Sequence, residues 1–275
     1  MIARFAEPGP AAVDPLAAFA PVTLAAANAR AAMLDRRTRK YVVADAVLRE
    51  LLVELRPDFD ALEIDGRRRF AYDTVYFDDT KLTSYYDHHQ GRRQRFKVRT
   101  RVYDTGDCYL EVKVKGPRGR TLKLRRPHPA ADARVLGPDA RAFVDRVHRD
   151  HYRRPAPARD TRPSLRLFYE RSCLVRRDGD ERLTVDCRIA FHRDAADPGR
   201  FDRVAVPGDR YIIETKSPDG RGVADRALRR LGQRPVRRCS KYCLGLALTR
   251  GLARRNRFRP ALRRLIGEPS AITAT

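Results

Sequence analysis

The sequence has no tryptophan, two methionines and five cysteines among its 275 residues. The cysteines are odd in number and none belongs to a paired CxxC motif, which argues against a disulfide framework and a zinc knuckle. Cys239 and Cys243 have the i, i+4 spacing of one helix face. We therefore expect reduced, buried thiols, which are typical of a cytoplasmic protein, and we predict that compartment.

Long apolar stretches are also missing. No window offers eighteen uninterrupted apolar residues, which is the approximate length that a transmembrane helix requires. Glu7 and Asp14 lie where a signal peptide would need its apolar core. The sequence predicts neither a membrane-spanning segment nor export.

Lysine is scarce although the chain is strongly basic. The formal net charge is +24, yet the chain has eight lysines, and all except Lys81 lie in the motifs described below. Lysine is a compact charge on a flexible stem, so it suits a site where a phosphate is met at one point. A strong base bias of the genome is an alternative explanation. The net charge predicts an anionic partner, which could be a nucleic acid, an anionic membrane surface or a phosphorylated substrate.

The stretch RFKVRTRVYDTGDCYLEVKVK, residues 95–115, has the strongest pattern. It predicts two strands joined by a turn at residues 104–107, with mostly apolar residues on one face. The other face has five cations around one carboxylate, namely Lys97, Arg99, Arg101, Lys113 and Lys115 around Glu111. This arrangement suggests a site for a polyanion and a metal, and a solvated sheet face is the alternative.

Further strands are expected to have charged side chains on one face. The sets that share a face are Arg36, Thr38 and Lys40; Lys123 and Arg125; Tyr169 and Arg171; Arg182, Thr184 and Asp186; and Ile212, Glu214 and Lys216. We predict an α+β, β-dominated fold, a closed antiparallel eight-stranded β-barrel tunnel with flanking helices, because a cationic interior calls for closure around a ligand or water. Such an interior should be wet and filled with anions.

Three regions are expected along the chain. Residues 1–20 are predicted to be disordered, residues 21–249 to form the tunnel domain, and residues 250–275 to form a basic tail. This tail has seven arginines against the single acid Glu268. A mobile tail is the preferred interpretation and a short amphipathic helix the alternative. Peripheral contact of this tail with an anionic membrane is a further prediction.

The ordered motifs resemble a known family. RRTRKYVV, TVYFDD, KVRTRVY, LEVKVKG, TLKLRR, YERSC, RLTVDCRI, IIETKS and CSKYCLGL together resemble the VTC domain of the polyphosphate polymerases, within the triphosphate tunnel metalloenzyme (CYTH-like) superfamily. The resemblance extends from about Phe19 to Ala247. It implies a β-barrel tunnel whose basic interior binds ATP and inorganic polyphosphate, with Mn²⁺ or Mg²⁺ held by a glutamate.

The resemblance also implies roles for single residues. Lys40, Arg99, Arg101 and Lys241 match the family's catalytic cations, and Glu214 matches its metal-binding glutamate. The structural alternative for Glu214 is an ion pair with Lys216 or Lys113. Glu111 is expected near the metal as an ion-pair residue, while Tyr76 and Asp78 are expected to be structural and His88 and His89 to lie in a loop. Further cations are expected to bind substrate, namely Lys97, Lys113, Lys123, Arg125, Arg171 and Arg182.

One departure from the wider superfamily bears on the activity. The glutamate-rich ExExK strand of that superfamily is replaced here by Arg36, Thr38 and Lys40. The loss of two metal-binding carboxylates favours the polymerase branch, in which the γ-phosphate of ATP is transferred to a growing polyphosphate. The alternatives are a tripolyphosphatase or nucleoside triphosphatase, and a non-catalytic module that binds polyphosphate or inositol pyrophosphate.

Sequence-specific binding of nucleic acid is not expected from the main body of the chain. Its cations alternate with aliphatic side chains, whereas a single-strand binder shows aromatics interleaved with cations. They also share faces with Glu111, Asp186 and Glu214, which would repel a phosphodiester in the absence of a metal.

Overall fold

The computed structural model describes residues 15–30, 37–116, 121–153, 161–193, 202–252 and 254–267. Within these residues the chain forms an 11-stranded sheet and seven α-helices. The predicted α+β, strand-dominated class is confirmed.

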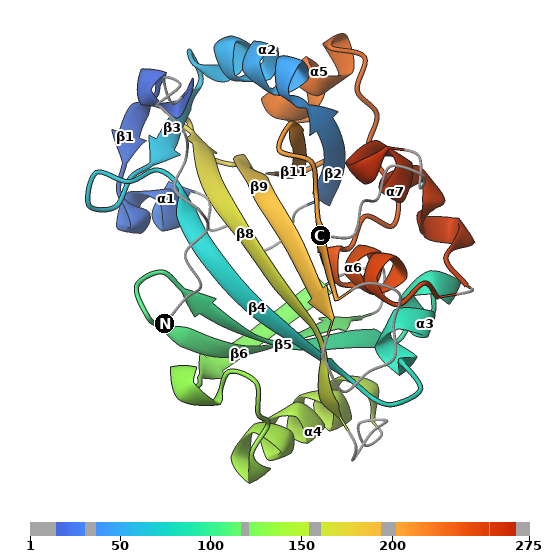
Figure 1. Ribbon diagram of the computed structural model, residues 1–275. Helices are drawn as coiled ribbons and strands as arrows, with labels where there is room; N and C mark the ends of the chain where they lie inside the picture. The colour runs from blue at the N-terminus through green and yellow to red at the C-terminus, as the bar shows by residue number, and fades with distance from the viewer. Residues whose placement is uncertain are drawn as a thin grey trace.

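Eight strands follow one another in the order β2, β11, β9, β8, β4, β5, β6 and β7, and each neighbouring pair is antiparallel (Figure 1). Three short strands extend the margins, because β3 pairs with β8, β1 with β3 and β10 with β9. The bounds are β1 (Ala20–Val22), β2 (Arg37–Ala44), β3 (Phe59–Leu62), β4 (Phe70–Asp78), β5 (Arg95–Tyr103), β6 (Cys108–Lys115), β7 (Thr121–Pro127), β8 (Arg162–Arg176), β9 (Arg182–Arg193), β10 (Arg203–Ala205) and β11 (Arg210–Ser217).

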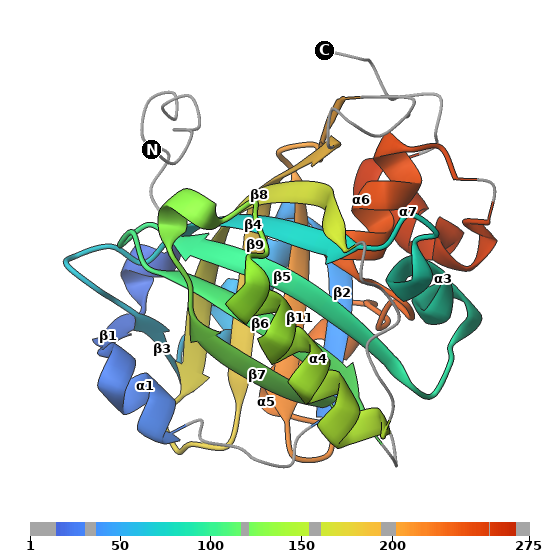
Figure 2. The same cartoon turned by 90° about the horizontal axis from the view of Figure 1, so that it is seen from below.

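The predicted closed barrel is not supported. In the part of the chain that is described, no ladder joins the two end strands β2 and β7. The loop before α6 instead contacts the free edge of β2. The Val236 amide donates a hydrogen bond to the Lys40 carbonyl at 2.7 Å. Strand β7 has the character of an edge, with exposed Lys123 and Arg125 and a terminal proline. The sheet is nevertheless strongly curved, so that β5, β6 and β7 lie in front of β2 and β11 in Figure 2.

Helices cover the convex side of this curved sheet. Helix α4 packs on β5 and β6 through Phe143, Val144 and Val147, and α2 and α5 pack together on β2, β9 and β11. Helix α1 packs at the β3 margin. The helix bounds are α1 (Leu24–Arg30), α2 (Asp45–Leu55), α3 (Thr83–Gln90), α4 (Pro138–Tyr152), α5 (Val223–Arg230), α6 (Lys241–Thr249) and α7 (Arg259–Ile266).

Helix α6 lies on the concave side. Its Tyr242 and Leu244 belong to one apolar cluster with Tyr76, Tyr169 and Ile212, which point inward from β4, β8 and β11. All nine residues of α6 are buried. The helix therefore fills part of the concave face, and the charged side chains occupy the part that it leaves.

The C-terminal segment differs from the predicted mobile tail. Phe258, Ala261, Leu262 and Leu265 are buried in the same apolar cluster as α6. The arginines of α7 lie on its exposed face, so residues 254–267 form the amphipathic structure that was the alternative. Contact with an anionic membrane through this segment stays a prediction.

The N-terminal segment is also ordered further than expected. Leu16 and Phe19 are buried against α2 and β3, and their carbonyls accept hydrogen bonds from the Arg68 guanidinium. The prediction of disorder is therefore wrong for residues 15–20, and residues 1–14 lie outside the described part. None of the described helices has the length and apolar character needed to cross a membrane.

Candidate functional site

Three lysines lie side by side on the concave face. The ladders pair Lys97 of β5 with Lys113 of β6, and Lys113 with Lys123 of β7. The predicted hairpin is thereby confirmed. Like charges directly opposite one another destabilise a sheet, so this lysine row is expected to attract an anion.

Lys113, at the centre of the lysine row, has no hydrogen bond or ion pair within the described residues. The residue is exposed to solvent on the concave face. Removal from bulk water, together with the positive charges of Lys40, Arg99 and Lys97, lowers the pKa of Lys113 to about 7. A phosphate beside it would favour the charged form.

Lys97 has neutral partners. Its ammonium donates to Ser240 Oγ at 2.7 Å and lies 3.3 Å from His88 Nδ1. Burial and the neighbouring Lys97 and Arg95 lower the pKa of His88 to about 2, so this imidazole is neutral and accepts a hydrogen bond from the Lys97 ammonium. His88 and His89 belong to helix α3, and their predicted position in a loop is wrong.

The next row contains an ion pair. Arg99 Nε lies 2.6 Å from Glu111 Oε2, and Lys123 Nζ lies 3.2 Å from Glu111 Oε1. The Arg99 guanidinium also donates to the Tyr76 hydroxyl at 3.1 Å. Burial would raise the pKa of Glu111, but Arg99, Arg101 and Lys123 hold it well below its ordinary value. Glu111 therefore orients two cations, as expected of an ion-pair residue.

Arg101 is buried between aromatic rings. Its guanidinium lies 5.0 Å from the Tyr72 ring and 5.7 Å from the Tyr169 ring, and its Nε donates to Thr74 Oγ1 at 3.3 Å. No carboxylate forms an ion pair with it among the described residues. This cation is held by cation–π contacts, which leave its charge uncompensated.

A second group of charges is fully paired. Arg171 Nε and Nη2 lie 2.5 and 2.9 Å from the two oxygens of Asp186, and Lys241 Nζ also contacts Asp186. Asp186 is inaccessible to solvent. Burial opposes its ionisation, but Arg171 and Lys241 dominate and lower its pKa to about 2. We call Arg171, Lys241 and Asp186 the Asp186 cluster.

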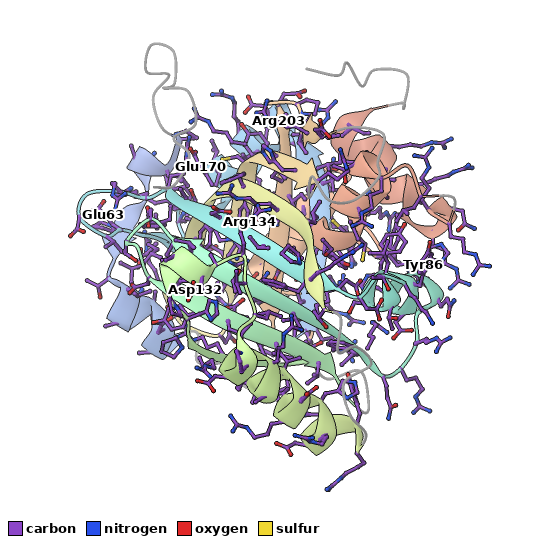
Figure 3. The ribbon with its side chains drawn as sticks, turned by 60° about the horizontal axis from the view of Figure 1, so that its bottom comes forward. Glu63, Tyr86, Asp132, Arg134, Glu170 and Arg203 are labelled. Atoms are coloured by element: carbon purple, nitrogen blue, oxygen red, sulfur yellow. The ribbon has the colours of Figure 1, made fainter. Side chains whose placement is uncertain are left out.

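A bulge in the sheet brings Asp186 into the site. The register of β8 and β9 shifts by one residue next to Glu170, which is labelled in Figure 3, and Arg188 opposite has a φ of 48°. Arg188 Nη1 lies 3.1 Å from Glu170 Oε1. An inserted residue reverses which side chains face inward. Ile189 therefore faces α6 on one side of the bulge, and Asp186 faces Arg171 on the other.

Glu214 is the third carboxylate of the concave face. Its oxygens lie 3.4 Å from Lys40 Nζ and 3.3 Å from Lys216 Nζ. Burial would raise the pKa of Glu214, but Lys40, Lys216 and Arg171 lower it well below its ordinary value. The ion pair with Lys216, which was the structural alternative for Glu214, is present, and Lys40 contributes a second one.

Glu214 fits a divalent cation that is also held by substrate. The described residues contain no group of three or more metal-ligating side chains. Mg²⁺ commonly uses one or two carboxylates and completes its shell with substrate phosphates and water. A single carboxylate beside several inward cations is compatible with this mode of binding.

Two predicted residues lie apart from this group. The exposed Arg125 stacks over Tyr109 at 4.9 Å. Arg182 donates to the Ala27 carbonyl and to Asn28 at the end of α1. Asp78 has the expected structural position. Its carboxylate accepts hydrogen bonds from the backbone amides of Asp79, Ser84 and Tyr85, at and before the start of α3.

Sequence reasoning assigned no role to two residues of the site. Asp186 was placed on an inward face by the alternation, but its ion pairs were not predicted. Ser240 follows Cys239 in the CSKY motif, and its contact with Lys97 joins segments 143 positions apart. No local pattern points to Ser240.

Two solved structures show limited similarity to this chain. A putative adenylyl cyclase from Hippeastrum, HpAC1, described as having a dominant triphosphatase activity, is 14% identical with a TM-score of 0.45 over 78% of this chain and 96% of its own. The PH1819 protein from Pyrococcus horikoshii OT3 is 13% identical with a TM-score of 0.41 over 77% of this chain and 98% of its own. At these scores neither structure supports a statement about the activity of this chain. No curated protein matches it.

A family match over most of the sequence shows the family of this chain. The VTC domain family matches residues 35–250, which include every inward-facing charge described above. This match confirms the resemblance that the ordered motifs predicted. The chain belongs to the VTC domain family.

Proposed function

We propose that the protein catalyses metal-dependent phosphoryl transfer from a nucleoside triphosphate or an inorganic polyphosphate bound on the concave face. The lysine row is the observation that supports this function best. Adjacent lysines on three strands repel one another unless an anion lies between them. A linear chain of phosphates has the charge spacing and the length to contact several such cations at once.

The inward cations would act mainly by neutralising charge. In phosphoryl transfer the bond between the terminal phosphorus and its bridging oxygen breaks while a new bond to the acceptor oxygen forms, and charge develops on the phosphoryl oxygens and the leaving group. Arg99 and Arg101 lie in the middle of β5, where they can meet these oxygens, and Lys40 and Lys113 can hold the neighbouring phosphates. Tyr76 and Glu111 keep Arg99 in place.

The metal would be held by Glu214 together with the phosphates. A bound Mn²⁺ or Mg²⁺ supplies further charge neutralisation when present. In the free protein, Lys40 and Lys216 form ion pairs with Glu214 and compensate its negative charge. Either lysine can turn to a phosphate when the carboxylate gains another partner.

The acceptor decides between two activities. Water as acceptor gives a tripolyphosphatase or nucleoside triphosphatase, which is the simplest activity because no second anion has to bind. An inorganic phosphate or polyphosphate as acceptor gives a polyphosphate polymerase with ATP as donor. The second activity is favoured by one observation: the three carboxylates that lie beside the inward cations are ion-paired, so none of them is an obvious base for water, while Lys113 has no ion pair among the described residues and remains for a second phosphate.

The products distinguish these activities. Purified protein is incubated with Mn²⁺ and either ATP or tripolyphosphate, and the products are separated by chain length. Orthophosphate without longer chains supports the hydrolase, whereas chains that an exopolyphosphatase degrades support the polymerase. Absence of both products with every donor and metal would contradict phosphoryl transfer.

The variant Glu214→Gln separates catalysis from binding. Turnover should fall by at least about a hundredfold, because the metal loses its protein ligand. Tripolyphosphate binding without metal should stay the same or tighten, since Lys40 and Lys216 lose their counter-charge. Isothermal titration calorimetry measures this binding, and Glu50→Gln on the exposed surface of α2 is the control. If turnover survives in Glu214→Gln, Glu214 does not hold the metal.

A further inference from the structure

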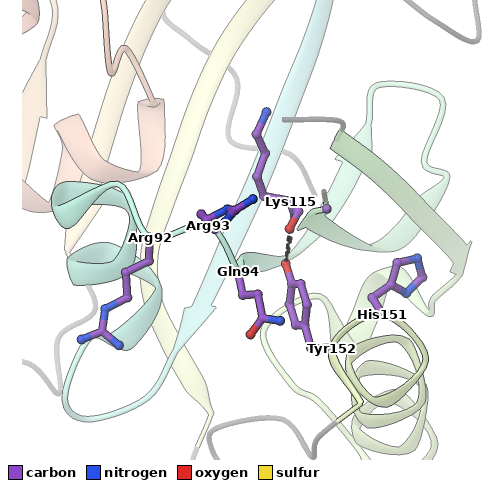
Figure 4. Close-up of a pocket in the computed structure, with 7 residues that line it drawn as sticks. Arg92, Arg93, Gln94, Lys115, His151 and Tyr152 are labelled. Atoms are coloured by element: carbon purple, nitrogen blue, oxygen red, sulfur yellow. Dashed lines mark hydrogen bonds between the residues drawn. The ribbon is translucent and has the colours of Figure 1, made fainter. Parts of the chain in front are cut away.

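A pocket opens at the end of the hairpin, beyond the lysine row. It has a volume of about 510 Å³ and lies between the segment after α3 and the C-terminal end of α4 (Figure 4). Its lining residues are Arg92, Arg93, Gln94, Lys115, Gly116, His151 and Tyr152. None of these residues is acidic, so the pocket is cationic.

This pocket continues the charged face of β5 and β6. Lys115 lies two residues beyond Lys113 on β6 and therefore on the same face of the strand. The ladder pairs Lys115 with Arg95 of β5, in the row next to the lysine row. A polyanion that extends along the strands from Lys113 would reach Lys115 first and the pocket next.

Arg93 supplies an uncompensated charge. Within the described residues its exposed guanidinium has no hydrogen bond or ion pair, and Figure 4 places it beside Lys115. Arg92, in contrast, has Asp87 as an ion-pair partner at 3.2 Å. Arg93 can therefore meet an anion without giving up another contact.

The wall of the pocket is fixed. The Tyr152 hydroxyl lies 2.8 Å from the Arg95 carbonyl and 2.9 Å from the Lys115 carbonyl, and accepts from the Lys115 amide at 3.0 Å. This side chain ties the last residue of α4 to the ends of both strands. His151 is held by a 2.8 Å hydrogen bond from Nδ1 to the Val147 carbonyl. The backbone around Lys115 is thus positioned before any ligand arrives.

We propose that this pocket binds the distal phosphates of a long inorganic polyphosphate whose other end lies on the lysine row. The proposal rests on the proposed function and adds that the protein distinguishes chains by length. Tripolyphosphate on the lysine row can reach Lys115, which lies two residues from Lys113, but it is too short to contact Arg93 as well, because Arg93 precedes the first residue of β5. A long chain gains a contact with Arg93 that a short chain lacks.

The test compares short and long chains in the single variant Arg93→Ala. In Arg93→Ala the dissociation constant for long-chain polyphosphate should rise at least about fivefold. The constant for tripolyphosphate should stay within about twofold of its value in the unchanged protein, because Coulombic effects of the pocket on the distant anion are screened. Both are measured by calorimetry at the same ionic strength. Lys115→Ala should weaken the binding of both chains, because Lys115 lies within reach of an anion at Lys113.

A charge-matched control separates the pocket from the general field of a basic protein. Arg146→Ala removes one exposed cation from α4 outside the pocket and should alter neither constant by more than about twofold. Equal weakening of short and long chains in Arg93→Ala, or no weakening of either, would overturn the proposal. If the unchanged protein binds neither chain, the proposed function itself fails.

Discussion

The lysine row and the Asp186 cluster lie on the same concave face but differ in how their positive charges are compensated. In the Asp186 cluster, Arg171 and Lys241 each contact a carboxylate that is inaccessible to solvent. In the lysine row three cations are neighbours, and Lys113 has no ion pair among the described residues. The first arrangement is complete without a ligand, whereas we propose that an anion completes the second.

This difference separates structural charges from binding charges. Breaking a buried ion pair costs several kcal/mol, so the Asp186 cluster should contribute to the folded state. The lysine row is imposed by the register of β5, β6 and β7, and its repulsion works against folding. The same repulsion is relieved when phosphates bind, which links the arrangement of the row to its affinity.

The largest expected effect concerns the Asp186 cluster. Asp186→Asn should lower the free energy of unfolding by about 3–5 kcal/mol, because Arg171 and Lys241 stay buried without a counter-charge. Chemical denaturation measures this change. Asp178→Asn is the control, since the Asp178 side chain is 83% exposed and its ion pair with Arg176 is long; it should cost less than about 1 kcal/mol. Equal stability of both variants would show that the cluster is not structural.

The opposite pattern is expected in the lysine row. Lys113→Met should leave the free energy of unfolding unchanged or raise it by up to about 1 kcal/mol, because it removes repulsion from Lys97 and Lys123. The affinity for tripolyphosphate should fall about tenfold, which corresponds to the loss of one charge-assisted contact. Calorimetry and denaturation of the same preparation measure both quantities. A loss of stability without a loss of affinity would reverse the roles of the two groups.

The smallest expected effect is a dependence on pH. The pKa of Lys113 is lowered to about 7, so Lys113 is charged below this pH and loses its proton as the pH rises through it. Because a bound anion favours the charged form, the affinity for tripolyphosphate should weaken as the pH rises above about 7. The dissociation constant of the unchanged protein should rise about three- to tenfold relative to that of Lys113→Arg between about pH 6.5 and about pH 8.5.

Lys113→Arg is the matched control for this pH dependence, because arginine stays charged throughout the range. Protonation of tripolyphosphate itself affects both proteins equally and cancels in the ratio. A ratio that does not change with pH would show that Lys113 does not titrate in this range or does not contact the anion.

Much of the fold could be predicted from alternation within single strands. The hairpin from Arg95 to Lys115, the turn at residues 104–107 and the inward faces of β9 and β11 follow from the period of two. The family also followed from the ordered motifs. These features depend on neighbours in sequence, which is why the sequence is sufficient for them.

The features that were not predicted depend on contacts between distant segments. The open edge of the sheet results from the loop at Val236, which uses the β2 edge. The order of α7 depends on the apolar cluster that it joins. The bulge at Arg188, which brings Asp186 to Arg171, leaves no mark in the alternation of RLTVDCRIAF. In each case a partner far along the chain decides the local structure.

A crystal structure of the complex with tripolyphosphate and Mn²⁺ tests the central claim most directly. We predict phosphate oxygens within about 3 Å of the Lys113 ammonium and the Arg99 guanidinium, with the metal on Glu214 and the Asp186 cluster unchanged. Phosphates bound only outside the concave face, for example on the arginines of α7, with no anion at Lys113, would contradict the account.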